Sequence, residues 1–295
     1  MMAYHPPRTS SLAVSFSLAT KRVHCFSPFR YPGGKTWLTP FVVRWLSPKV
    51  DYIVEPFTGG GNVSIAAISF NLAEKAFLAE KDPNVSAVWK VMLNGCCGQL
   101  VDRVKAFNLT RKTVESVLNS PAKTTLDLAF KTIIRNRVSH GGVMAKGAGL
   151  LKNGEDGHGL SSRWYPETLS SRIAHINSLK KRFSFCEANG VNLLKVFAEI
   201  GIEGDAAFFI DPPYSVAGRR LRRLYHYHEV DHAELFRIAA TLPGRILMTY
   251  DNSAYIKRLA RESNFLVRSI PMRSVHHVEK HELLISKAFD WLDHG

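Results

Sequence analysis

An apolar run followed by a carboxylate, two prolines and an aromatic ring is the segment best suited to chemistry. Residues 206–210 read Ala-Ala-Phe-Phe-Ile, which predicts a buried parallel strand. Asp211, Pro212, Pro213 and Tyr214 follow directly, and the prolines end the strand in a rigid turn. A carboxylate, a backbone carbonyl and a ring at a strand's carboxyl end suit an exocyclic amine on a flat base. The alternative is a tight turn with a capping aspartate.

A glycine-rich loop between a predicted strand (51–57) and a predicted helix (62–71) suits a nucleotide-like cofactor. Its candidate binding residues are Glu55, Pro56, Phe57, Gly59 and Gly61. Glycines there let the backbone approach a ligand closely. Glu80 ends the next predicted strand, 21 residues after Gly59 (80 − 59), a spacing that sets a carboxylate against ribose hydroxyls. A nicotinamide dehydrogenase could share this much.

The segment 29–36 contains a third candidate group, Phe-Arg-Tyr-Pro-Gly-Gly-Lys-Thr. Its Gly-Lys-Thr ending is similar to a phosphate-binding loop. That loop requires glycine where Phe29 stands, together with a preceding strand. We therefore do not expect a nucleoside triphosphatase.

The elements that position these groups alternate between strand and helix, which predicts a doubly wound, mostly parallel α/β sheet. Further strands are expected at 183–186, 245–250 and 283–286, and helices at 82–93, 231–241 and 253–262. Residues 98–181 break the alternation, with helix-like stretches at 122–137 and 166–180 around a glycine-rich loop. We therefore predict a catalytic domain at 26–97 and 182–295, an inserted, mainly helical region at 98–181, and a flexible basic tail at 1–25.

Taken together, the lysine segment, the glycine loop and Asp211–Tyr214 resemble the Dam-type N6-adenine DNA methyltransferases, in the family's order. The resemblance spans roughly residues 26–290 and makes the inserted region the expected target-recognition region. It implies S-adenosylmethionine as cofactor, with contacts from Tyr31, Lys35, the Glu55–Gly61 loop, Glu80, Asn189 and Asp211. Asn189 stands where an aspartate often contacts the cofactor's adenine amine.

The resemblance also implies a mechanism. The Asp211 carboxylate and the Pro212 carbonyl would accept the two N–H bonds of the adenine amine, and Tyr214 would stack on the flipped base. An RNA adenine methyltransferase is the first alternative. The second is a nucleic-acid-binding protein on the same scaffold that does not catalyse.

A net charge of +14 and a sequence pI near 9.7 favour a polyanionic partner, which the resemblance makes double-stranded DNA. Within the inserted region, Arg135, Asn136 and Arg137 are expected to contact bases. After the tetrapeptide, four arginines are expected to clamp phosphates: Arg219, Arg220, Arg222 and Arg223. The alternative for each is a solvated surface charge.

The remaining expectations concern surroundings. No apolar stretch is long enough to cross a membrane, and the four cysteines have no zinc spacing. We expect reduced, mostly buried thiols, no metal, and a cytoplasmic monomer of bacterial or phage origin. The sequence leaves open whether a companion restriction endonuclease exists.

Overall fold

A seven-stranded sheet forms the centre of the computed structural model, which describes residues 26–30, 35–142, 149–152, 154, 157–213, 230–273 and 279–293. In spatial order its strands are β3 (Phe183–Glu187), β2 (Ala73–Glu80), β1 (Val50–Glu55), β4 (Ala206–Ile210), β5 (Arg245–Asp251), β7 (Glu279–Ser286) and β6 (Leu266–Arg273). Strand β7 pairs antiparallel with both β5 and β6, and the other neighbouring strands of this sheet pair in parallel.

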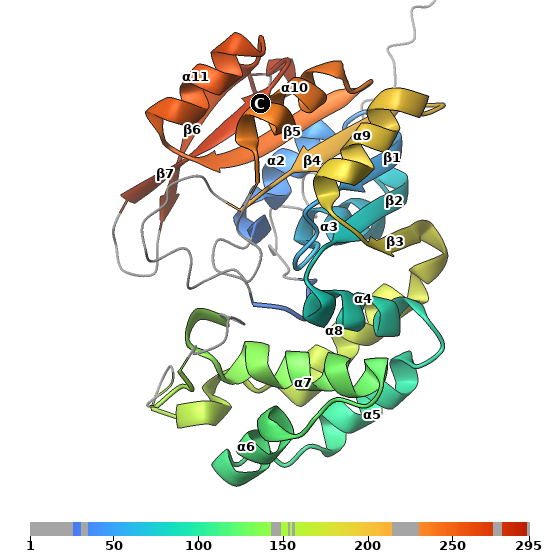
Figure 1. Cartoon of the computed structure of the whole chain (residues 1–295), viewed down its shortest axis with the longest axis vertical. Coiled ribbons are helices and arrows are strands. Elements are labelled where there is room, and N and C mark those ends of the chain that lie inside the picture. The colour runs from blue at the N-terminus through green and yellow to red at the C-terminus, as the bar shows by residue number, and fades with distance from the viewer. Residues whose placement is uncertain are drawn as a thin grey trace, which may run out of the picture.

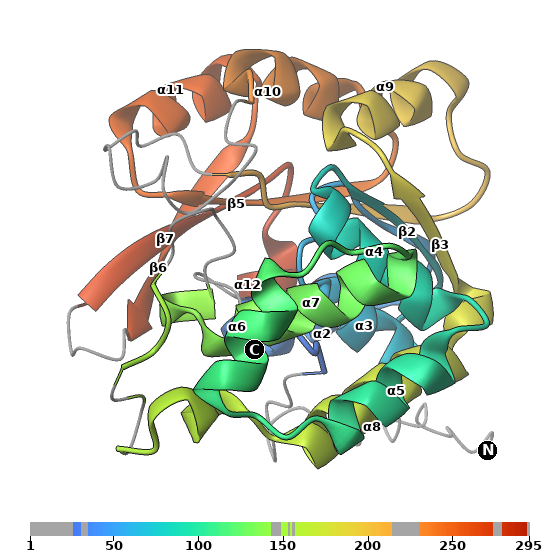
Figure 2. The ribbon, with the colours of Figure 1, turned by 60° about the horizontal axis from the view of Figure 1, so that its bottom comes forward.

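Helices cover both faces of this sheet (Figures 1 and 2). One face carries α9 (Gly190–Ile200), α10 (His232–Thr241) and α11 (Ala254–Glu262). The other carries the 3₁₀ helix η1 (Lys35–Leu38), α2 (Thr39–Trp45), α3 (Asn62–Ser69), α4 (Pro83–Leu93) and α12 (Asp290–Asp293). Beyond α4 lie α5 (Cys97–Ala106), α6 (Arg111–Asn119), α7 (Thr125–Val138) and α8 (Pro166–Ser178). The doubly wound, mostly parallel α/β class predicted from the sequence is confirmed.

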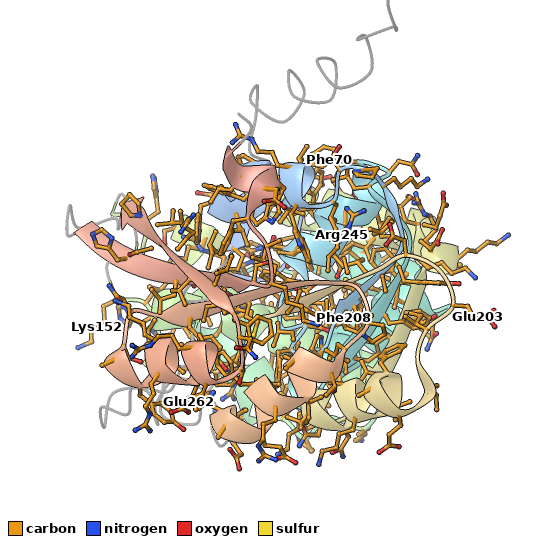
Figure 3. The ribbon with its side chains drawn as sticks, turned by 90° about the horizontal axis from the view of Figure 1, so that it is seen from above. Phe70, Lys152, Glu203, Phe208, Arg245 and Glu262 are labelled. Carbon is orange, nitrogen blue, oxygen red and sulfur yellow. The ribbon has the colours of Figure 1, made fainter. Side chains whose placement is uncertain are left out.

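Strand β4 shows why the core has two halves. All five of its residues are buried, as expected for a strand covered on both faces. Ala207 and Phe209 belong to the cluster on the α2–α4 side, whereas Phe208 and Ile210 belong to the cluster under α9–α11. Figure 3 shows Phe208 in the interior and Glu203 and Glu262 at the periphery. Burying one phenylalanine contributes roughly 1.5–3 kcal/mol.

Helix starts follow local capping chemistry. The Asp82 side chain accepts a hydrogen bond from the Asn84 backbone, so α4 begins where the sequence predicts. Thr124 and Asp127 form a capping box at the start of α7. The sequence patterns did not predict α2, α5, α6, α9, α12 or β6.

Two further expectations concern the burial of the cysteine thiols and membrane-spanning segments. Cys97 is buried, but Cys96 and Cys186 are exposed, so the expectation of mostly buried thiols is wrong for two of the three described cysteines. In the part of the chain that the structure describes, no helix is both long and apolar enough to span a membrane.

Candidate active site at the carboxyl edge of the sheet

The candidate site lies where the strand order reverses. The chain builds outward from β1 to β2 and β3, then returns to place β4 on the other side of β1. Glu55 is the last residue of β1 and Asp211 directly follows β4. Open α/β sheets bind ligands in the crevice at such a switch point.

Lys35 contacts two carboxylates at this edge of the sheet. Its Nζ lies 3.0 Å from Oδ2 of Asp211 and 2.9 Å from Oε1 of Glu282 on β7. The side chain is 6% exposed. Burial alone would lower the pKa of Lys35, but attraction to Asp211 and Glu282 and hydrogen bonds to both more than offset this, so the pKa is raised. Lys35 is therefore a fixed positive charge at neutral pH.

Asp211 is held by two elements besides its own strand. Oγ1 of Thr249, on β5, donates to Oδ1 at 2.7 Å, while Lys35 binds Oδ2. The Asp211 side chain nevertheless keeps 23% of its surface exposed. A fixed carboxylate with an exposed part can accept an N–H bond from a substrate amine.

Glu55 is fully enclosed beside this cluster. Its Oε2 accepts a hydrogen bond from the Ser64 backbone at 3.0 Å. Burial, opposed by the Ser64 hydrogen bonds and reinforced by the nearby Asp211 charge, raises the pKa of Glu55 to about 8. Glu55 is therefore mostly protonated at neutral pH and leaves Asp211 and Glu282 as the negative partners of Lys35.

Glu80 and the glycine loop form a shaped cradle. The two carboxylate oxygens of Glu80 accept the backbone N–H groups of Gly59 and Asp82, each at 2.8 Å. Burial raises the pKa of Glu80, and these hydrogen bonds offset part of the rise. Trp89 Nε1 donates to the Gly59 carbonyl at 2.9 Å and fixes the loop from below.

Gly61 explains why this loop requires glycine. Its φ is +64°, and an added Cβ would lie 2.4 Å from the Trp89 ring. The loop backbone therefore packs directly against the Trp89 ring, where a side chain would not fit. A carboxylate at the end of β2 beside such a loop has the chemistry to accept hydrogen bonds from ribose hydroxyls, and its contact with S-adenosylmethionine stays a prediction.

Asn189 follows β3 at the same carboxyl edge of the sheet. Its Oδ1 accepts from the Val191 backbone at 3.0 Å and so caps α9. A Cβ on the following Gly190 would lie 2.0 Å from the Pro56 carbonyl, so the β3 loop packs tightly on the glycine loop. Contact between Asn189 and the cofactor stays a prediction.

The structure corrects the expected base contacts of α7. Asn136 is fully buried: its Oδ1 accepts from the Arg30 backbone N–H at 2.8 Å, and its Nδ2 donates to the carbonyls of Arg30 (2.8 Å) and Gly142 (3.1 Å). Arg137, 3% exposed, donates to the Pro28 carbonyl. Both side chains anchor the segment at 26–30 and do not face nucleic acid. Arg135 is partly exposed, and its contact stays a prediction.

Other predicted residues fall outside the described residues. These are Tyr31, Tyr214, Arg219, Arg220, Arg222, Arg223 and the tail at 1–25. Pro212 is buried and Pro213 partly buried at the end of β4.

Sequence reasoning missed Thr249, Glu282 and Trp89. Glu282 is an acid directly before the apolar run Leu283-Leu284-Ile285, a signal that could have marked it. Nothing in the local sequence around Thr249 or Trp89 distinguishes them from core residues.

The strand order and the antiparallel β7 define the fold as that of the S-adenosylmethionine-dependent methyltransferases. No protein-family model and no curated protein sequence matches the chain.

Several solved structures are weakly similar to this chain. The rRNA methyltransferase aviRa from Streptomyces viridochromogenes is 12% identical, with a TM-score of 0.39 over 94% of this chain and 95% of that one. A protein assigned as an RNA methyltransferase from Pyrococcus horikoshii is 11% identical, with 0.38 over 93% and 94%. Precorrin-6y C5,15-methyltransferase from Geobacter metallireducens is 11% identical, with 0.36 over 85% and 86%. At these TM-scores the likenesses say nothing about substrate.

Proposed function

We propose that this protein transfers a methyl group from S-adenosylmethionine to the N6 amine of adenine in double-stranded DNA. The observation that carries the proposal is the Asp211 carboxylate, fixed by Lys35 and Thr249 at the switch point beside the glycine cradle. The choice of an amine as the group that is methylated comes from the resemblance to Dam-type enzymes.

The cofactor, when bound, would supply an electrophilic methyl group. Glu80 and the glycine loop would hold its ribose and methionine parts. Asp211 and the Pro212 carbonyl would accept the N–H bonds of the amine, whose lone pair is otherwise delocalised into the base. The amine lone pair would form the bond to the methyl carbon as the carbon–sulfur bond breaks and its electrons stay on the sulfur, and the nitrogen would then release one proton to solvent. Most of the rate enhancement would come from positioning and fixed charges.

Nucleic acid is supported as the substrate class by the net charge of +14. Adenine in RNA would present the same amine to Asp211, so duplex DNA is favoured by the family resemblance alone. The experiment therefore separates the two.

The test is methyl transfer from labelled S-adenosylmethionine to unmethylated duplex DNA, single-stranded DNA and RNA, followed by nucleoside analysis. We expect N6-methyladenine in duplex DNA. Asp211→Ala should lower the rate by at least about 100-fold while cofactor binding stays measurable by calorimetry. Label in RNA alone would overturn the DNA assignment, and cofactor binding without label in any substrate would favour a non-catalytic scaffold.

A further inference from the structure

Strand β7 joins the Asp211 cluster indirectly, because its Glu282 pairs with Lys35 and Lys35 pairs with Asp211. Glu282 lies on β7 opposite Asp251 of β5 and Ile270 of β6. It is 1% exposed. Side chains alternate along a strand, so Glu282 shares a face with Leu284, which packs in the cluster on the α2–α4 side. That face is the one on which η1 places Lys35.

The ammonium of Lys35 is shared between two carboxylates. Its distances to Asp211 Oδ2 (3.0 Å) and Glu282 Oε1 (2.9 Å) are nearly equal. Asp211 is partly exposed toward the crevice, whereas Glu282 is enclosed. Glu282 therefore fixes Lys35 in the interior, and Asp211 is the member of the cluster that solvent can reach.

We infer that Glu282 is a positioning residue for methyl transfer: it fixes Lys35 and, through it, sets the orientation and charge of the Asp211 carboxylate. This inference rests on the proposed function of Asp211. An ammonium paired with Asp211 alone would move toward that carboxylate and neutralise more of its charge. Sharing with Glu282 holds the ammonium midway, so Asp211 remains a strong acceptor for an amine N–H.

Acidic groups on several strands surround Lys35. Glu55 on β1 and Asp211 after β4 lie within its electrostatic reach, as does Glu282 on β7. Tyr250 and Asp251 on β5 interact with the same carboxylate cluster. Glu282 is a hydrogen-bonded partner of Lys35, whereas Glu55 holds its proton. Next to Asp211, Glu282 is therefore the group whose charge, when removed, should change the pKa of Lys35 most.

The test compares Glu282→Gln with a matched change on the same strand, Ser286→Ala. Ser286 donates to the Ile246 carbonyl at 2.7 Å in the core, away from Asp211. We expect Glu282→Gln to lower kcat at least 10-fold with the Kd of S-adenosylmethionine changed less than 2-fold. Ser286→Ala should lower Tm without lowering kcat. Equal losses of kcat in both variants would mean a merely structural role and would overturn the inference.

A double-mutant cycle with Lys35→Met tests the route of the effect. If Glu282 acts through Lys35, Glu282→Gln should have no further effect on kcat in the Lys35→Met background. Losses that multiply fully would show independent roles and overturn the inference.

A readout that needs no turnover separates this inference from the proposed function. Titration of 15N-labelled lysine ammonium signals, with Lys35→Met for assignment, should show Lys35 losing its proton at lower pH in Glu282→Gln than in the wild type. An unchanged titration would remove the Glu282–Lys35 coupling. Absence of methyl transfer by the wild type would refute the proposed function, and the coupling between Glu282 and Lys35 could still be measured.

Discussion

At the scale of single residues, two carboxyl groups close to Lys35 lie in different environments. Glu55 is enclosed and hydrogen-bonded by Ser64, and burial raises its pKa to about 8. Asp211, which directly follows the neighbouring strand β4, is partly exposed and paired with Lys35. Environment alone therefore divides one chemical group between a structural and a substrate-facing role.

Glu55 should make stability depend on pH. Its folded pKa lies above its unfolded value of about 4.5, so the folded state binds more protons between these values and stability falls as pH rises from about 5 to 8. The full loss is on the order of a few kcal/mol. Glu55→Gln keeps an acceptor for Ser64 and should flatten this fall.

The check is the difference in Tm between Glu55→Gln and wild type across pH 5 to 9. The difference should grow with pH and level off above about pH 8. A constant difference over this range would show that Glu55 does not titrate there.

At the scale of elements, the glycine loop between β1 and α3 depends on its fit against α4. Gly61→Ala places a Cβ 2.4 Å from the buried Trp89 ring in a left-handed backbone conformation. We expect at least a 10-fold loss of S-adenosylmethionine affinity and a Tm lower by several degrees, because either the loop or Trp89 must move. The strain alone costs about 1–3 kcal/mol.

Gly95→Ala is the matched control. It follows the end of α4, and its added Cβ meets nothing within 4 Å. Calorimetry and thermal unfolding should show it close to wild type. Equal behaviour of the two variants would mean that the loop is not held against Trp89 as described.

The elements also show what sequence can predict. β4 and its neighbours were predictable because an all-apolar run such as Ala206–Ile210 has one plausible environment, and parallel strands bring Glu55 and Asp211 to one edge. β6 was missed because Pro271 interrupts a mixed pattern, and α9 because it opens on Gly190. Thr249 reaches Asp211 through the pairing of β5 with β4, and Glu282 reaches Lys35 through the antiparallel register of β7; no local pattern encodes either contact.

At the scale of the whole molecule, α7 ties the helices outside α4 to the segment that leads to Lys35. Asn136 pairs with both backbone groups of Arg30 as a neighbouring strand would. Gly142 fits closely here, since an added Cβ would lie 2.1 Å from the Arg30 carbonyl. The helical region is thus attached to this segment by side-chain hydrogen bonds to the backbone of Pro28 and Arg30.

Asn136→Leu should therefore destabilise the protein, with each buried backbone group left unpaired costing about 1–3 kcal/mol. Arg135→Ala should instead weaken binding to duplex DNA and reduce its salt dependence, with Tm little changed. Thermal unfolding and fluorescence anisotropy at several salt concentrations measure both effects. Weaker DNA binding in a fully folded Asn136→Leu variant would instead indicate that Asn136 contacts DNA directly.

The pairing of β1 with β4 also has a consequence for how the chain folds during synthesis. Tyr52 pairs with Ala206, 154 residues later (206 − 52), and such distant pairings fold slowly. Until residue 206 of 295 has left the ribosome, the inner edge of β1 has no partner and its apolar face is open to other chains. We expect the nascent protein to depend on chaperones over that interval, and expression to be limited by aggregation more than by the stability of the finished fold.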